Sequence, residues 1–148
     1  MGNQIDTMRD LRRRLDGAFR PDTASEGFPG TTPSTGHCAA VAAIVHELLG
    51  GQMVSTLVEG HSHWINRIEC DGQRIDIDLT GDQFGRAPVQ VGHPDELYPG
   101  LRVRLPTELT ADTLERARLL AERAGLLDIA RDLADKLATQ SQLRSVRV

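Results

Sequence analysis

Aromatic residues are scarce in this sequence, and the scarcity limits what the protein can bind. Phenylalanine, tryptophan and tyrosine make up 3% of the 148 residues. A platform on which nucleotide bases stack is therefore hard to build, and the core must consist mainly of leucine, isoleucine, valine and alanine. The chain also lacks a cationic excess, since 17 basic and 21 acidic residues give a formal net charge of −4. Phosphate recognition needs such an excess locally, so we expect no nucleic-acid partner.

Cysteine is scarce as well, and no segment resembles a targeting or membrane-spanning sequence. Cys38 and Cys70 are the two cysteines, too few for a disulfide framework. The first 20 residues are amphipathic and charged, without the apolar centre of a signal peptide, and no apolar run reaches the length of a membrane span. We therefore expect a cytoplasmic protein with reduced thiols and no membrane partner. The one basic run, 12–14, is typical of the solvated face of a helix.

The length and the hydrophobic content of the chain are sufficient for a single domain over 1–148. Hydrophobic residues make up 39% and charged residues 26% of the chain, as in soluble globular proteins. Apolar residues at helical spacing predict a helix over 5–19 that ends before Pro21. Residues 21–36 are rich in Pro, Gly, Ser and Thr and predict a long loop beside a functional site. A second helix is predicted from Cys38 to Leu49, ended by Gly50 and Gly51.

After the second helix, apolar and polar residues alternate with the period of two that is typical of strands. Residues 52–58, 62–69 and 73–80 predict an antiparallel meander, with 71–72 (Asp-Gly) as a hairpin turn. Residues 81–100 are predicted to be irregular, 101–105 to form a short strand, and 111–124 and 126–137 to form helices. The predicted fold class is α+β: a small antiparallel sheet, the Cys38 helix packed on it, and terminal helices at the edges. The terminal helix pair, rich in Leu and Ala, could also form a homodimer interface.

Cys38 is the residue that points most directly to chemistry. It stands in the first turn of a predicted helix, where unpaired backbone N–H groups and the helix dipole favour a thiolate. The helical spacing of Cys38, Val41, Val45 and Leu48 directs its side chain toward the rest of the protein. The alternative is that Cys38 is a small buried hydrophobic residue, the common role of a lone cysteine.

The predicted hairpin tests whether a base can assist Cys38. A turn at 71–72 pairs Cys70 with Gln73, and this register fixes every other pair. One face of the hairpin then meets the core through Trp64, Asn66, Ile68, Ile75, Ile77 and Leu79. The other face carries His61, His63, Ile65, Arg67, Asp76, Asp78 and Thr80. Asp78 is placed to accept a hydrogen bond from His63, and Asp76 to pair with Arg67, but a slip of one residue would exchange the faces.

A cysteine at a helix start, followed by a hairpin that offers His and then Asp, is the order found in papain-like and transglutaminase-like hydrolases. The runs GHCAAVAAIVHELLGGQMV, HWINRI and IDIDLTGDQF resemble the YunG-like family of small bacterial proteins, firmly over 33–84. The helix after Leu105-Pro106 fits the family more loosely. This family is similar in layout to papain-like and NlpC/P60-like cysteine hydrolases.

The resemblance implies that Cys38, His63 and Asp78 are the triad positions. It also marks Asn66 and the Asp-Gln-Phe segment at 82–84 as associated features. In this pattern we expect glutamine before the cysteine, where the chain has His37. The backbone N–H of Cys38 is then left as the expected oxyanion donor.

Zinc binding is an alternative that the same residue types suggest. His37, Cys38, His61, His63 and Cys70 offer enough nitrogen and sulfur ligands for one ion. No pair among them has a C-x-x-C or H-E-x-x-H spacing, which argues against a metal site. The remaining histidines, at 46 and 93, are expected to be solvated.

The function expected from these observations is that of a cysteine-dependent hydrolase or acyl transferase. Its substrate would be a small molecule or peptide with an amide or (thio)ester bond. Cys38 is the expected nucleophile, His63 the general base and then acid, and Asp78 the orienting carboxylate, with no cofactor. Residues expected to support the site or bind substrate are His37, His61, Asn66, Asp76 and Gln83. The alternative is a non-catalytic domain that binds a protein or small ligand through the same cleft.

Overall fold

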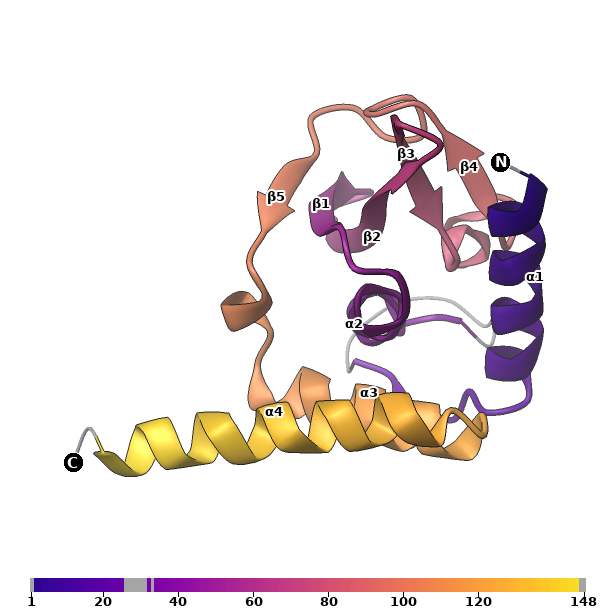
Figure 1. Ribbon diagram of the computed structural model, residues 1–148. Helices are drawn as coiled ribbons and strands as arrows, with labels where there is room; N and C mark the ends of the chain where they lie inside the picture. The colour runs from indigo at the N-terminus through magenta and orange to yellow at the C-terminus, as the bar shows by residue number, and fades with distance from the viewer. Residues whose placement is uncertain (1, 26–31, 33, 147–148) are drawn as a thin grey trace.

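The computed structural model describes residues 2–25, 32 and 34–146, which form an antiparallel sheet packed against helices (Figure 1). The strand order is β4-β3-β2-β1-β5. The α+β class expected from the sequence is confirmed. The helices are α1 (Gly2–Asp16), α2 (Cys38–Leu49), α3 (Ala111–Arg123) and α4 (Leu127–Val146). The strands are β1 (Gln52–Val58), β2 (His61–Cys70), β3 (Gln73–Asp78), β4 (Gln90–Gly92) and β5 (Arg102–Arg104).

The elements form layers around α2. Figure 1 shows α2 between the sheet and the α3–α4 pair, with α1 standing at the side next to β4. Because α2 packs on both sides, its residues from Ala40 to Val45 are all buried. The main core therefore lies where α2 meets Ile68, Ile75 and Ile77 of the sheet. Cys38, the first residue of α2, stands at the edge of this core.

The hairpin register predicted from the Asp-Gly turn is confirmed. Cys70 pairs with Gln73 and Asn66 with Ile77. Asp71 and Gly72 have φ values of 52° and 78°, the left-handed pair that a two-residue hairpin turn requires. The observed pairs between β2 and β3 run from Asn66 to Cys70, so the first half of β2, which contains His63, continues beyond them. The space beside that half is where the candidate site lies.

The face of the sheet opposite α2 carries a second, smaller apolar cluster. Val54, Ile65 and Tyr98 form its centre. The segment between β4 and β5, which contains Tyr98, covers this face. A stretch without helical or strand periodicity thus buries a large aromatic ring.

Several boundaries and exposures differ from the sequence predictions. Strand β4 was missed, because three residues are too short for a periodic signal. Helix α1 ends at Asp16 rather than residue 19, and α4 extends to Val146 rather than 137. Leu48 is 42% exposed, so it does not share the buried face of α2, and His46 is half-buried rather than solvated. His93 is exposed as expected.

Arg12 is the residue whose observed environment differs most from the one that the sequence predicts. We expected the 12–14 run to be solvated, but Arg12 is buried, because it follows the apolar face of α1 between Leu11 and Leu15. The predicted loop over 21–36 is only partly described, since 26–31 and 33 lie outside the described residues. Within the described part of the chain, no helix has both the length and the apolar character needed to cross a membrane.

Candidate active site

Cys38 occupies the first position of α2 and is 4% exposed. Its thiol donates to the backbone carbonyl of Ser62 in β2, with Sγ and O 3.6 Å apart. The preceding residue, His37, makes no side-chain cap to the helix, and the first helical bond runs from the N–H of Val41 to the carbonyl of His37. Backbone N–H groups of the first turn, including that of Cys38, therefore lie outside the helical bonding pattern and can bind an anion.

His63 lies beside Cys38 and is held by Asp78. Its Nε2 donates to Oδ2 of Asp78 over 2.9 Å, and both side chains are 0% exposed. Burial by itself lowers the pKa of His63, but hydrogen bonds with Asp78 and Cys38, together with their charges, raise it from 6.5 to about 9. Because Asp78 engages Nε2, the interaction with Cys38 falls to Nδ1, which also lies 3.4 Å from Nε2 of Gln83. The raised pKa favours the positively charged imidazole at neutral pH.

Asp78 is fixed by donors from two directions. The Tyr98 hydroxyl donates to Oδ2 over 2.5 Å, and the Thr80 backbone N–H donates to Oδ1 over 2.9 Å. Burial of the phenol and the charge of Asp78 both raise the pKa of Tyr98, so its hydroxyl keeps its proton. A carboxylate held in this way can neither rotate nor leave the ring of His63.

Two aromatic rings and one amide set the position of the His63 ring. Phe84 and Tyr98 contact it edge-on, with centroids 4.8 and 5.0 Å away. The Gly36 N–H donates to Oε1 of Gln83 over 3.1 Å, and Nε2 of Gln83 lies 3.4 Å from Nδ1 of His63. Gln83 therefore ties the residues before Cys38 to the ring that lies beside Cys38.

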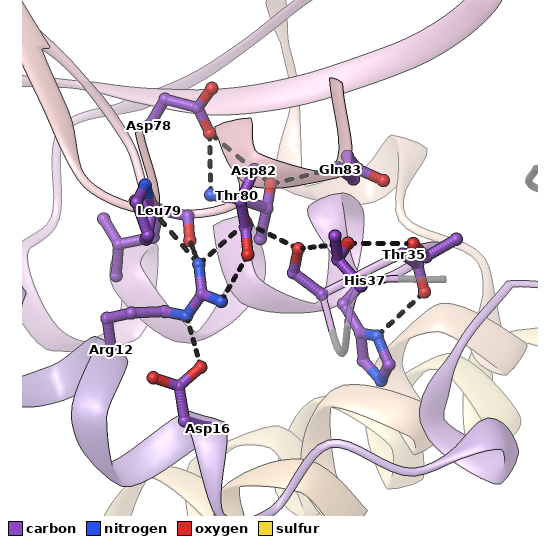
Figure 2. A network of polar contacts seen from close by, with 12 residues as sticks. Arg12, Asp16, Thr35, His37, Asp78, Leu79, Thr80, Asp82 and Gln83 are labelled. Carbon is purple, nitrogen blue, oxygen red and sulfur yellow. Dashed lines mark hydrogen bonds and ion pairs between the residues drawn. The ribbon is translucent and has the colours of Figure 1, made fainter. Parts of the chain in front are cut away.

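The segment that carries Gln83 is anchored by an ion pair between a buried arginine and a half-buried aspartate. Figure 2 shows the Arg12 guanidinium, from α1, against the Asp82 carboxylate, with Nη2 and Oδ2 2.7 Å apart. Arg12 also donates to the carbonyl of Leu79 over 2.7 Å, and Ser34 donates to Asp82 over 2.6 Å. Burial raises the pKa of Asp82, but hydrogen bonds from Arg12 and Ser34 outweigh it and hold the pKa below its usual range. This network joins α1, the loop before Cys38 and the 3-10 turn Gly81–Phe84.

The other residues expected at the site have structural surroundings. His37 donates through Nδ1 to the Thr35 carbonyl over 3.1 Å, and its Nε2 lies 2.7 Å from the Thr23 hydroxyl. Burial lowers the pKa of His37 to about 4, so its ring is neutral. Because both ring nitrogens are engaged, His37 is not available as an acid or base. His61 begins β2 opposite Val58 and is half-buried.

Asn66 and Asp76 stabilise the frame around the site. Asn66 donates through Nδ2 to the carbonyl of Ala42 over 2.9 Å and so ties β2 to α2. Asp76 accepts two hydrogen bonds from Arg67, at 2.7 and 3.1 Å, and a third from the N–H of Asp95 at 2.9 Å. Asp78, two residues along the same face of β3, is therefore the carboxylate that meets the histidine.

The residues discussed as zinc ligands are dispersed. Among the described residues, no group of three or more His, Cys, Asp or Glu side chains is arranged to hold a metal ion. Cys70 lies at the opposite end of β2 from His61 and is buried in the main core.

Three residues of the site were missed by sequence reasoning. Arg12 and Ser34 meet Asp82 across separations of 70 and 48 residues, which no local pattern reveals. Tyr98 is the single tyrosine of the chain and lies in an irregular segment. A buried tyrosine needs a partner for its hydroxyl, and that requirement alone could have linked Tyr98 to a buried carboxylate.

Comparison with known proteins gives a family but no characterised relative. No curated protein matches the chain, and no solved structure matches it. A family model described as YunG protein matches residues 7–123, which include the Arg12–Asp82 ion pair, Cys38, His63 and Asp78. The protein therefore belongs to the YunG family.

Proposed function

We propose that this protein is a cysteine-dependent hydrolase or acyl transferase with a papain-like arrangement of its α+β fold. One observation supports this most strongly: a buried imidazole, His63, bonded to Asp78 on one nitrogen and interacting with Cys38, with a pKa of about 9. A positive imidazole beside a thiol stabilises the thiolate, which is the nucleophilic form of cysteine.

The reaction begins with attack of the Cys38 thiolate on the carbonyl carbon of an amide or ester. The backbone N–H of Cys38 donates to the developing oxyanion. The bond from the carbonyl carbon to the leaving nitrogen or oxygen breaks, and the leaving group takes the proton from Nδ1 of His63. The product is a thioester on Cys38.

The second step removes the acyl group from Cys38. His63 takes a proton from water or an amine, which attacks the thioester carbon and releases the thiolate. Asp78 holds the ring in one orientation throughout, and the cycle balances without a cofactor. Water gives hydrolysis, and an amine gives acyl transfer.

The sequence also supports a proposal for the substrate class, the cellular compartment and the partners. The substrate is a small molecule or a peptide, and the reduced thiol suits the cytoplasm. We propose neither nucleic acid nor membrane as a partner, and the α3–α4 pair is the surface proposed for a homodimer.

The burial of Cys38 favours a second candidate function. Its side chain is 4% exposed and its thiol donates to Ser62, so a non-catalytic domain that binds a ligand beside a buried cysteine fits this observation. Such a domain would not form a covalent acyl intermediate.

Covalent acylation separates the two candidates. The purified protein is mixed with p-nitrophenyl acetate, and its intact mass and tryptic peptides are measured over time. The proposal predicts one acetyl group on Cys38, absent from Cys38→Ala and retained in Cys70→Ala, the matched variant at the other cysteine. Acetylation that is absent, or equal in Cys38→Ala and the wild type, would contradict it.

A further inference from the structure

A cavity lies at the β5 edge of the sheet, beside Ser62 of β2. Its volume is about 350 Å³, and its lining includes Ser55, Ser62, Arg102 and Arg104. Ser62 connects the cavity to the site, because its carbonyl oxygen accepts the hydrogen bond from the Cys38 thiol. A substrate whose acyl carbon meets Cys38 can therefore extend into this cavity.

The strand register places the cavity on the same face of the sheet as α2. Ser55 pairs with Trp64 on β2 and with Arg102 on β5, and Met53, two residues before Ser55, lies in the core under α2. Alternation along the strands then puts Ser55, Arg102 and Arg104 on the face that Cys38 approaches. Two strand spacings, roughly 10 Å, separate β2 from β5, a distance that a flexible arginine side chain shortens.

The two arginines differ in how they are held. Nε of Arg104 donates to the buried hydroxyl of Ser55 over 2.7 Å, its Nη1 lies 3.2 Å from Glu108, and its guanidinium lies 5.4 Å from the centre of the Trp64 ring. Arg104 is thus fixed in place. Arg102 is exposed, and within the part of the chain that the structure describes no hydrogen bond or ion pair engages its guanidinium.

Charge at this end of the cavity favours an anion with a single charge. Glu108 is already bonded by the N–H of Leu105 and by Arg104, and the charges of Arg104 and Arg102 contribute to holding its pKa below the usual range. Two guanidinium groups and one carboxylate leave one net positive charge, and the guanidinium that remains for a ligand is Arg102. A guanidinium binds a carboxylate through paired hydrogen bonds.

We propose that this cavity binds a carboxylate of the substrate through Arg102, so that Cys38 acts on acyl groups that carry a carboxylate a few atoms from the scissile carbonyl. This inference rests on the proposed function, because it assigns a substrate class to the same nucleophile. An acidic side chain or a peptide C-terminus supplies such a group. One positive charge suits a carboxylate better than a doubly charged phosphate.

Two alkylating reagents of matched shape test the inference. Bromoacetyl-β-alanine carries a carboxylate beyond its reactive carbon on a flexible spacer, and bromoacetyl-β-alanine amide is its uncharged counterpart. The rate at which each labels Cys38 is measured by mass spectrometry in the wild type, in Arg102→Ala and in Arg74→Ala. Arg74 is an exposed arginine on β3 and controls for the loss of one surface charge.

We expect the ratio of acid to amide labelling rates to fall roughly threefold to fivefold in Arg102→Ala, the effect of an exposed ion pair, and to stay unchanged in Arg74→Ala. Labelling by the uncharged amide should be equal in all three proteins. A ratio that Arg102→Ala leaves unchanged, while both reagents label Cys38, would overturn this inference alone. If neither reagent labels Cys38, the proposed function fails, and the substrate assignment fails with it.

Discussion

Replacing Asp78 by asparagine tests the electrostatics of the site most fully. Asparagine has the same shape, and its amide oxygen can accept the hydrogen bonds from His63 and Tyr98, whereas its NH2 group cannot accept the one from the Thr80 N–H. The substitution removes the negative charge that His63 meets over 2.9 Å. The main influence that raises the pKa of His63 is thus lost while the shape of the side chain is kept.

The size of the expected pKa change follows from the opposing influences on the His63 ring. Burial lowers the pKa of His63, and the hydrogen bond with Asp78 is the largest of the influences that raise it to about 9, followed by the hydrogen bond with Cys38 and the charge of Asp78. Without the carboxylate, burial dominates, and the pKa should fall to 6.5 or lower. A fall of this size corresponds to about 3 kcal/mol between the charged and neutral rings.

The assay is an NMR pH titration of the five histidine rings, with His63→Gln to assign the signal of His63. The wild type should show one ring that titrates near pH 9, and Asp78→Asn should show that ring at or below pH 6.5. Asp76→Asn, which removes the carboxylate that pairs with Arg67, controls for the loss of a nearby buried charge. A ring that still titrates near pH 9 in Asp78→Asn would show that Asp78 does not raise the pKa of His63.

Three further predictions concern stability and are measured by urea denaturation. Because the pKa of His63 rises from 6.5 to about 9 on folding, its contribution is complete below pH 6.5 and is lost as the pH rises through 9. The free energy of unfolding should therefore fall by about 3 kcal/mol over that range, and a constant value in the wild type, or an equal fall in His63→Gln, contradicts this. Arg12→Met should cost about 2 kcal/mol by leaving the half-buried Asp82 without its arginine, while Arg13→Met, at a position 77% exposed, should cost almost nothing; equal costs would refute the anchoring role. Gly51→Ala should destabilise more than Gly50→Ala, because both residues have positive φ but only at Gly51 would a Cβ meet a backbone oxygen, at 2.5 Å; similar losses would exclude that contact.

The hairpin and its pairing were predictable because their determinants are local. The Asp-Gly turn and the alternation of apolar residues fix which side chains of β2 and β3 share a face. The sequence thus placed Asp76 beside Arg67 and Asp78 near His63, as the structure has them. The start of α2 at Cys38 and its end before two glycines were equally local.

The surroundings of the site were not predictable, because they depend on contacts between residues that are distant in the sequence. The Arg12–Asp82 pair joins residues 70 positions apart, and a buried arginine in a basic run has the same local pattern as a solvated one. Tyr98 reaches Asp78 from a segment without periodicity, and β4 is three residues long. Gln83 was noted from the family resemblance, but its contact with Gly36 depends on how two loops meet.

Whether His63 activates Cys38 can be measured by alkylation with iodoacetamide at neutral pH. The rate at which Cys38 is modified is measured by mass spectrometry in the wild type and in His63→Ala, with His61→Ala as the matched variant on the same strand. We expect rapid modification in the wild type and in His61→Ala, and modification slower by about tenfold or more in His63→Ala. Slow modification at equal rates in all three proteins would contradict it.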